Sequence, residues 1–131
     1  MIEKCILNDE INLSKYIDFS IKQICDYLSI NTKISKSSNI LKEESLKAQD
    51  RIIYINQVKK STIYINPIGG LELYNKEDFL NNNIELYFLK TNQIIYKQFK
   101  NEFVPNLSII DVMMFNNKEE IKKILEECVL V

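Results

Sequence analysis

The chain has 131 residues, which fits one domain over residues 1–131 and leaves little room for a second. Hydrophobic residues make up 46% and charged residues 27%, a composition typical of globular rather than disordered proteins. The net charge of -1 argues against a nucleic-acid partner bound mainly through counterion release. No apolar run approaches the roughly 18 to 20 residues that a membrane span needs, so none is predicted.

Histidine is absent, which excludes Ser-His-Asp and Cys-His mechanisms within this chain and any His-ligated zinc site. We therefore predict no metal site, and the residues indicate no particular cofactor. The cysteines Cys5, Cys25 and Cys128 are far apart in the sequence and form no C-x-x-C pair. Their odd number, and an N-terminal stretch unlike a secretory signal, predict reduced thiols in a cytoplasmic protein.

Hydrophobic periodicity predicts strands that alternate with helices. The expected strands are residues 4–7, 32–37, 62–66 and 84–89. The expected helices are residues 13–28, 45–59, 76–82 and 107–115, and a last helix capped by Asn117 with Glu120 three residues on. Residues 93–101 fit no single element. This order predicts an α/β fold with a mostly parallel sheet of about four short strands and flanking helices, in a Rossmann-like layered arrangement.

Gly69 and Gly70 are the only glycines, and they directly follow the strand that Pro67 ends. Glycine permits positive φ and close approach of a ligand to the backbone, and ligands bind at the carboxyl ends of parallel strands. The loop is therefore a candidate binding site. A tight turn without a ligand is the alternative interpretation, because two adjacent glycines are a weak signal.

The helix expected over residues 45–59 carries Asp50 and Arg51, the only arginine. Gln49 and Asn56 fall on one line of this helix, flanked by isoleucines, which suggests amides that point inward and need partners. Arginine suits anion recognition. The alternative is a surface Asp-Arg pair with amides that bond to backbone.

Asp111 interrupts the apolar segment 107–115, which we expect to form a buried helix with Asn106 as N-cap. A buried carboxylate must be paired or protonated, so Asp111 either lines a pocket or accepts backbone N–H groups from a nearby loop. Ser108 lies on the same side of the helix. A buried carboxylate keeps its charge only with donors nearby, and the expected donors to Asp111 are Arg51, the Gly69–Gly70 amides and the loop amides around Asn66, in one cluster.

Three segments resemble the WbqC-like family in order and spacing. They read L-K-A-Q-D-R-I-I over residues 46–53, Y-I-N-P-I-G-G-L-E-L-Y over 64–74 and F-V-P-N-L-S-I-I-D-V-M-M-F-N over 103–116. The resemblance covers the chain from about Ile17 onward and corresponds to the C-terminal half of the family. It implies that Asp111 is the catalytic residue and that these residues bind the substrate: Gln49, Asp50, Arg51, Asn66, Gly69, Gly70, Glu72, Tyr74, Asn106 and Ser108.

The resemblance implies a role in bacterial surface polysaccharide (O-antigen) biosynthesis, as a glycine or aminoacyl transferase acting on an amino sugar. The implied partners are a nucleotide-sugar or another sugar-linked small molecule. Because the tryptophan-containing pattern of the family's N-terminal half is missing, a separate chain carrying that half, or a homo-oligomer, is also an expected partner, and the chain alone is expected to be inactive. A non-catalytic binding module and a half-domain that only completes a fold are the alternatives.

Overall fold

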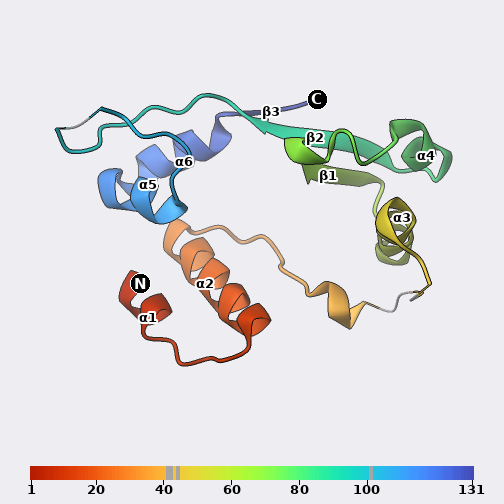
Figure 1. Ribbon diagram of the computed structural model, residues 1–131, viewed down its shortest axis with the longest axis horizontal. Helices are drawn as coiled ribbons and strands as arrows, with labels where there is room; N and C mark the ends of the chain where they lie inside the picture. Colours follow the sequence, from red (N-terminus) through yellow and green to blue (C-terminus); the bar gives the residue numbers. More distant parts are fainter. Residues whose placement is uncertain (41–42, 44, 101) are drawn as a thin grey trace. The chain divides into compact units, whose positions relative to one another are not determined.

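The computed structural model describes residues 1–40, 43, 45–100 and 102–131, which form two compact units (Figure 1). Unit 1 comprises Met1–Ile34 and Gln93–Glu127, and unit 2 comprises Ser35–Asn92 and Cys128–Val131. Within the described part of the chain, no helix is long and apolar enough to cross a membrane.

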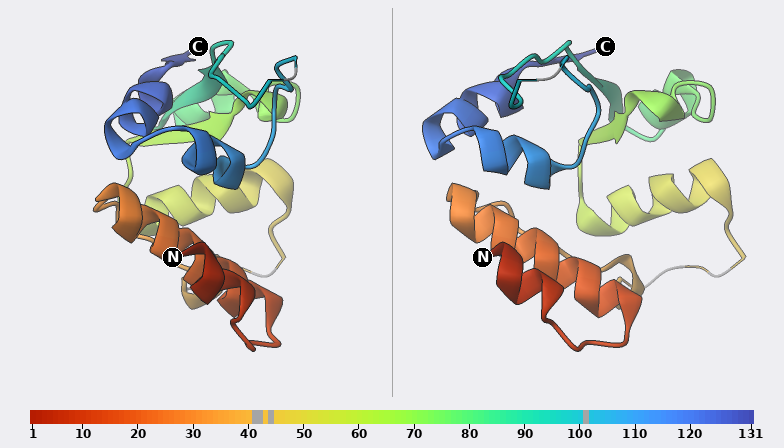
Figure 2. Two further views of the ribbon diagram at one scale, coloured as in Figure 1. Left: turned by 90° about the vertical axis from the view of Figure 1, so that its left-hand side faces the viewer. Right: turned by 60° about the vertical axis from the view of Figure 1, so that its left-hand side comes forward.

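Unit 1 is helical. Its helices are α1 (Ile2–Ile6), α2 (Leu13–Leu28), α5 (Ile109–Phe115) and α6 (Lys118–Glu126). The two N-terminal helices, α1 and α2, lie side by side in both views of Figure 2. The expected strand over residues 4–7 is wrong. The Leu7 N–H donates to the carbonyl of Glu3 at 2.9 Å, so the local i to i-4 bonds of a helix satisfy this backbone instead of a sheet.

Helix α2 has the bounds that the sequence pattern predicts. Asn12 caps it by accepting the Lys15 N–H at 3.1 Å, and Ser29 ends it in the left-handed conformation. Its apolar stripe is mostly uncovered: Leu28 is buried, but Ile17 and Ile21 remain 45% and 43% exposed. The periodicity therefore predicted the helix correctly but not how much of its apolar face is buried.

The capping box at the start of α6 is confirmed. The Asn117 side chain accepts the N–H groups of Glu119 and Glu120 at 3.0 Å, and the Glu120 carboxylate accepts the Asn117 N–H at 2.8 Å. Fully buried Ile121 anchors the helix, and the Lys118 ammonium lies 4.3 Å from the ring centroid of Tyr27 in α2. These contacts join α6 to α2 within unit 1.

Helix α5 differs from the sequence expectation in its start and in its burial. Ser108, in extended conformation, is the N-cap, whereas Asn106 has φ 59° and cannot serve as that cap. No residue of α5 is buried, and Ile110 and Met114 are 43% and 69% exposed. The apolar composition of α5 did not predict its burial correctly, because few elements pack around this short helix.

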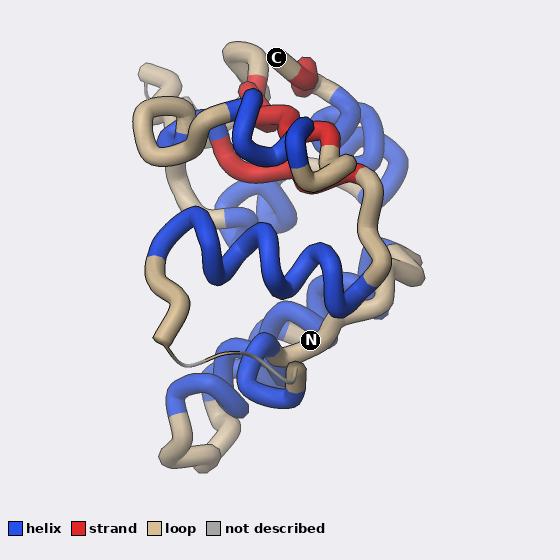
Figure 3. The backbone as a smooth tube through the Cα atoms, turned by 90° about the vertical axis from the view of Figure 1, so that its right-hand side faces the viewer, coloured by secondary structure: helices blue, strands red, loops and turns tan. Residues whose placement is uncertain are grey.

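Unit 2 contains the sheet. Its strands are β1 (Ile63–Pro67), β2 (Glu85–Thr91) and β3 (Cys128–Leu130), drawn in red in Figure 3. Its helices are α3 (Ala48–Lys59) and α4 (Lys76–Asn81), with short 3-10 turns η1 (Ser37–Asn39) and η2 (Ile68–Gly70). β1 pairs with β2 in parallel, with Tyr64 opposite Leu86, and β2 pairs with β3 antiparallel.

An α/β fold is confirmed, but the expected sheet of about four mostly parallel strands is wrong. Of the four expected strands, residues 62–66 and 84–89 form β1 and β2, whereas residues 32–36 have no regular structure and η1 begins at Ser37. The third strand, β3, was missed because three residues are too few to show an alternating pattern. Pairing of Leu89 with Leu130 makes the sheet mixed.

The core of unit 2 forms where α4 packs on one face of the sheet. Phe79 of α4 is fully buried and contacts the inward residues of β2, Leu86 and Phe88, in a cluster with Ile53 of α3 and Ile84. The Tyr64 ring stacks on Phe79 at 5.6 Å between centroids, so β1 is attached to the same core. This packing fixes the carboxyl end of β1, where the glycine loop begins.

We expect Asn117→Ala to lower the free energy of unfolding of the chain by about 1 kcal/mol, because α6 loses a cap that satisfies two backbone donors. Urea unfolding followed by circular dichroism measures this. Asn117→Ser retains a capping oxygen and should remain within a few tenths of a kcal/mol of the wild type. Equal losses in both variants would contradict the cap.

Candidate functional site

The glycine loop follows β1 as predicted, but its glycines do not adopt positive φ, so that expectation is wrong. Both lie in the η2 turn. A Cβ atom on Gly70 would lie 1.9 Å from the Asn66 amide nitrogen and 3.1 Å from the Tyr74 ring. A Cβ atom on Gly69 would meet nothing within 4 Å. Gly70 is therefore required for packing, and only Gly69 offers open backbone to a ligand.

The side chain that fills the space over Gly70 is itself fully engaged. Asn66 accepts the Tyr64 hydroxyl at 3.0 Å and donates to the Pro67 carbonyl at 3.1 Å. The Tyr74 ring packs edge-on against Tyr64, with centroids 6.2 Å apart. Burial, and then its neighbour Tyr74, raise the pKa of Tyr64. Of the expected binding residues here, Asn66 and Tyr74 hold the loop together, whereas Glu72 is exposed.

Gln49 on α3 connects this helix to the start of α4. Its amide nitrogen donates to the Asp78 carboxylate at 2.7 Å, and its oxygen accepts the Asn75 N–H at 2.6 Å. Of the two amides expected to point inward on this helix, Asn56 is buried and Gln49 is half-buried. Asn56 donates to the Ile52 carbonyl at 2.9 Å, which is the backbone bond that the alternative interpretation described. With both ends of its amide occupied, Gln49 serves the fold of unit 2.

Arg51 is half-buried, and its Nε donates to the Leu46 carbonyl at 2.8 Å, while Asp50 is exposed. This bond holds the segment that leads into α3. Among the described residues, Arg51 donates a hydrogen bond only through Nε. Its two terminal guanidinium nitrogens can therefore still bind an anion. Arg51 is thus a candidate anion contact of unit 2.

Asp111 is the centre of a hydrogen-bonded cluster in unit 1. Its Oδ2 accepts the Tyr96 hydroxyl at 2.5 Å and the Gln98 amide at 2.8 Å. The Gln98 side chain also donates to the Val104 carbonyl and accepts the Val104 N–H at 2.8 Å. Within unit 1 the donors to Asp111 are therefore Tyr96 and Gln98. Arg51 and the glycine-loop amides belong to unit 2, and the expectation that they donate to Asp111 stays a prediction.

A small pocket of about 160 Å³ lies beside this carboxylate. Its lining residues are Gln98, Phe99, Glu102, Val104, Leu107, Asp111 and Phe115. The rings of Phe99 and Phe115 meet edge to face at 4.6 Å between centroids, and Tyr96 packs on Phe103 at 5.2 Å. Burial, and then the bond to Asp111, raise the pKa of Tyr96, so this phenol stays a donor. A carboxylate among aromatic rings suits a ligand that presents N–H or O–H groups.

Sequence reasoning missed Tyr96 and Gln98, because residues 93–101 fitted no single element. Asn101 of this segment lies outside the described residues. In the structure Tyr96 and Gln98 are two residues apart and both half-buried, whereas Ile95, Lys97 and Phe99 are exposed, so the two side chains lie on one face of an extended segment. The residue types give no matching signal, because the exposed positions include the apolar Ile95 and Phe99 and the half-buried ones include the polar Gln98.

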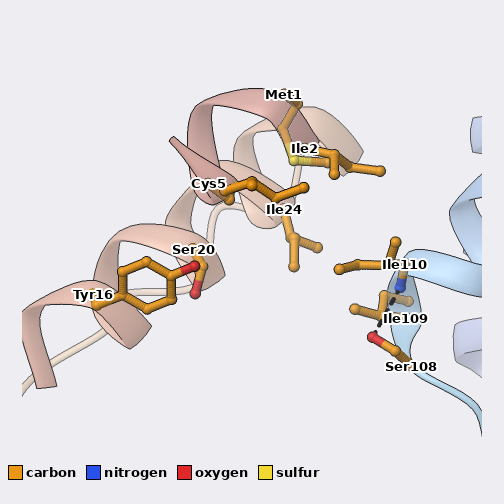
Figure 4. Close-up of a pocket in the computed structure, with 10 residues that line it drawn as sticks. Met1, Ile2, Cys5, Tyr16, Ser20, Ile24, Ser108, Ile109 and Ile110 are labelled. Atoms are coloured by element: carbon orange, nitrogen blue, oxygen red, sulfur yellow. Dashed lines mark hydrogen bonds between the residues drawn. The ribbon is translucent and has the colours of Figure 1, made fainter. Parts of the chain in front are cut away.

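The remaining two expected site residues lie in unit 1, near the start of α5. Asn106 is exposed, and Ser108 accepts the Ile110 N–H at 3.2 Å. Ser108 also lines a second cavity, of about 270 Å³, between α1, α2 and the start of α5 (Figure 4). Over the described residues no cluster of three His, Cys, Asp or Glu could hold a metal ion.

The structure divides the residues that the sequence predicted for one cluster between its two units. Gln49, Arg51 and the glycine loop belong to unit 2, whereas Asp111 and Ser108 belong to unit 1. Each group has its own hydrogen-bond partners. The pocket beside Asp111 is therefore a candidate site that lies within a single unit.

Comparison with known proteins identifies the class of protein to which this α/β chain belongs. The family model described as the WbqC-like protein family matches residues 1–123. The chain is therefore a member of the WbqC-like family. The match begins at the first residue, which corrects the expectation that only a C-terminal half, from about Ile17, is similar. No curated protein matches the chain. No solved structure matches it either.

We expect Gly70→Ala to destabilise the chain by about 1 to 3 kcal/mol, because its Cβ would displace the Asn66 amide. Gly69→Ala, with open space around the new methyl group, should stay within about 0.5 kcal/mol of the wild type. Denaturant unfolding measures both. In an Asn66→Ala background the cost of Gly70→Ala should fall, and purely additive effects would contradict this coupling.

In the cluster around Asp111, the titration of the Tyr96 phenol can be measured. Its pKa is raised above the ordinary tyrosine value, so it should ionise at higher pH than a solvent-exposed tyrosine, and the stability that the neutral phenol contributes should be lost as pH rises through its folded-state pKa. NMR of carbon-13-labelled tyrosine measures this titration. Asp111→Asn removes the carboxylate charge and should lower the pKa of Tyr96 part of the way. An unchanged Tyr96 titration would contradict the contact.

Proposed function

We propose that this WbqC-like chain takes part in the biosynthesis of bacterial surface polysaccharide. In this proposal it transfers a glycyl or another aminoacyl group to the amine of an amino sugar, supplied as a nucleotide-sugar. Membership of the family supports the biological role. The one observation that carries the chemistry is the Asp111 carboxylate, held by Tyr96 and Gln98 at the edge of an aromatic-lined pocket.

The hydrogen bonds around Asp111 favour its use as an acceptor. Tyr96 and Gln98 both donate to Oδ2, and no other described residue donates to Oδ1. Two fixed donors hold the carboxylate in one orientation, so it need not reorganise when a ligand binds. Oδ1 can then accept an N–H of the sugar amine, while the aromatic rings cover the apolar side of the sugar.

The reaction proposed is direct transfer. The neutral sugar amine attacks the aminoacyl carbonyl, a C–N bond forms, and the bond between the carbonyl carbon and the donor's leaving group breaks. Asp111 takes the extra proton from the amine and returns it to the departing group. Positioning and electrostatics carry the catalysis, since the chain has no histidine to activate a nucleophile.

The free thiols of Cys5 and Cys25 support placing this reaction in the cytoplasm. A reducing compartment leaves such thiols unpaired, and nucleotide-sugars would be the available acceptors in the proposal. We also propose that Arg51 and the open backbone at Gly69, which both belong to unit 2, can contact an anionic group.

The test incubates the purified chain with UDP-glucosamine and a glycyl thioester of N-acetylcysteamine, and follows glycylated sugar by mass spectrometry. We expect Asp111→Asn to lower the rate by about 10²- to 10⁴-fold, as for loss of a general base. Asp26→Asn, which changes an exposed carboxylate on α2, should leave the rate unchanged. This proposal takes the single chain as sufficient, in place of the expectation that the chain alone is inactive, so no product, or equal rates for both variants, would contradict it.

A second candidate role is non-catalytic, as a chain that pairs with a separate partner. The observation that favours it is the uncovered face of the sheet in unit 2, where Ile63, Ile65 and Leu130 are each about half exposed. β1 is also an edge strand of the described sheet, because β2 is its only partner there. UDP-glucosamine binding without transfer, or co-purification with a WbqC-like partner chain, would favour this role.

A further inference from the structure

The cavity between α1, α2 and the start of α5 has two kinds of lining. One part is aliphatic, with Ile2 of α1, Ile24 of α2 and Ile110 of α5 (Figure 4). The other part carries the hydroxyl groups of Tyr16 and Ser20, which lie one turn apart on α2. At about 270 Å³ the cavity is slightly smaller than pockets for drug-sized ligands, so it fits a small molecule or a short group of a larger one.

Of these two hydroxyl groups, one can accept a hydrogen bond from a ligand and the other can donate one. The Ser20 hydroxyl donates to the Ile17 carbonyl at 3.0 Å, so toward the cavity its oxygen is left as an acceptor. The Tyr16 hydroxyl has no partner among the described residues and can donate. A matching ligand therefore presents one acceptor and one donor close together, as a carbonyl and an N–H do in a secondary amide.

The charge of the lining further limits the class of ligand that the cavity can bind. The lining side chains carry no charge and offer no counter-ion for a carboxylate or ammonium group, and the one charged group among the lining residues is the α-amino group of Met1. The aliphatic part would gain free energy by removing an alkyl chain from water. The lining side chains therefore match a neutral polar group attached to a short hydrocarbon.

We propose that this cavity binds a secondary amide that carries a short aliphatic chain, such as an N-acyl group. The Tyr16 hydroxyl donates to the amide carbonyl, the amide N–H donates to Ser20 Oγ, and the chain lies against Ile24 and Ile110. The cavity shares no lining residue with the pocket beside Asp111, so this inference does not depend on the proposed transferase reaction.

The experiment titrates the whole chain with N-methylhexanamide and with N,N-dimethylhexanamide, which lacks the N–H donor. Isoleucine methyl resonances in NMR report binding. We expect saturable binding of N-methylhexanamide and about 3- to 10-fold weaker binding of the dimethyl compound. Tyr16→Phe should weaken both by a similar factor, and Ser20→Ala should remove the difference between the two amides.

Two further variants control for location and folding. Ile24→Trp fills the aliphatic part and should abolish binding, whereas Tyr27→Phe makes the same phenol-to-phenyl change on α2 outside the cavity and should not alter it. Circular dichroism confirms that each variant is folded. No saturable binding, equal affinity for the two amides in the wild type, or unchanged binding in Tyr16→Phe would each overturn the proposal.

Discussion

The packing of Phe79 is the contact on which unit 2 depends. This fully buried ring stacks on Tyr64 of β1 at 5.6 Å and meets the edge of Tyr74 at 5.9 Å, and it contacts the inward side chains of β2. Its carbonyl also accepts the Ile84 N–H at 3.0 Å, which directs the chain from α4 into β2. The parallel pair β1–β2 and the glycine loop therefore share one anchor, and the loop's geometry follows from core packing.

Unit 1 combines a few buried residues and ring contacts with polar contacts. Few of its residues are fully buried, Leu28 and Ile121 among them, but caps and side-chain bonds fix its segments. The amide of Gln98 bonds to both backbone groups of Val104, much as a neighbouring strand would, and thereby positions the residues around Asp111. Because unit 1 has only a small apolar core, these side-chain hydrogen bonds determine the position of the candidate site.

The sequence predicted local elements better than long-range ones. Helix α2, strands β1 and β2, and the capping box at Asn117 were identifiable because periodicity and caps are written in neighbouring residues. β3 was not identifiable, because its pairing with Leu89 and Lys90 depends on residues about forty positions away. Asp111 was found as an unusual carboxylate in an apolar segment, but its donors Tyr96 and Gln98 were not, since propensity says little about an irregular segment.

The close approach of Asn66 to Gly70 links the identities of two positions that are not adjacent in the chain. The amide of Asn66 occupies the space in which any other residue at position 70 would place its Cβ atom. A change at either position alone leaves a clash or a gap, whereas a joint change can restore the packing. Among WbqC-like proteins, these two positions should therefore covary as a pair, so their covariation would reflect steric fit even if neither residue contacts a substrate.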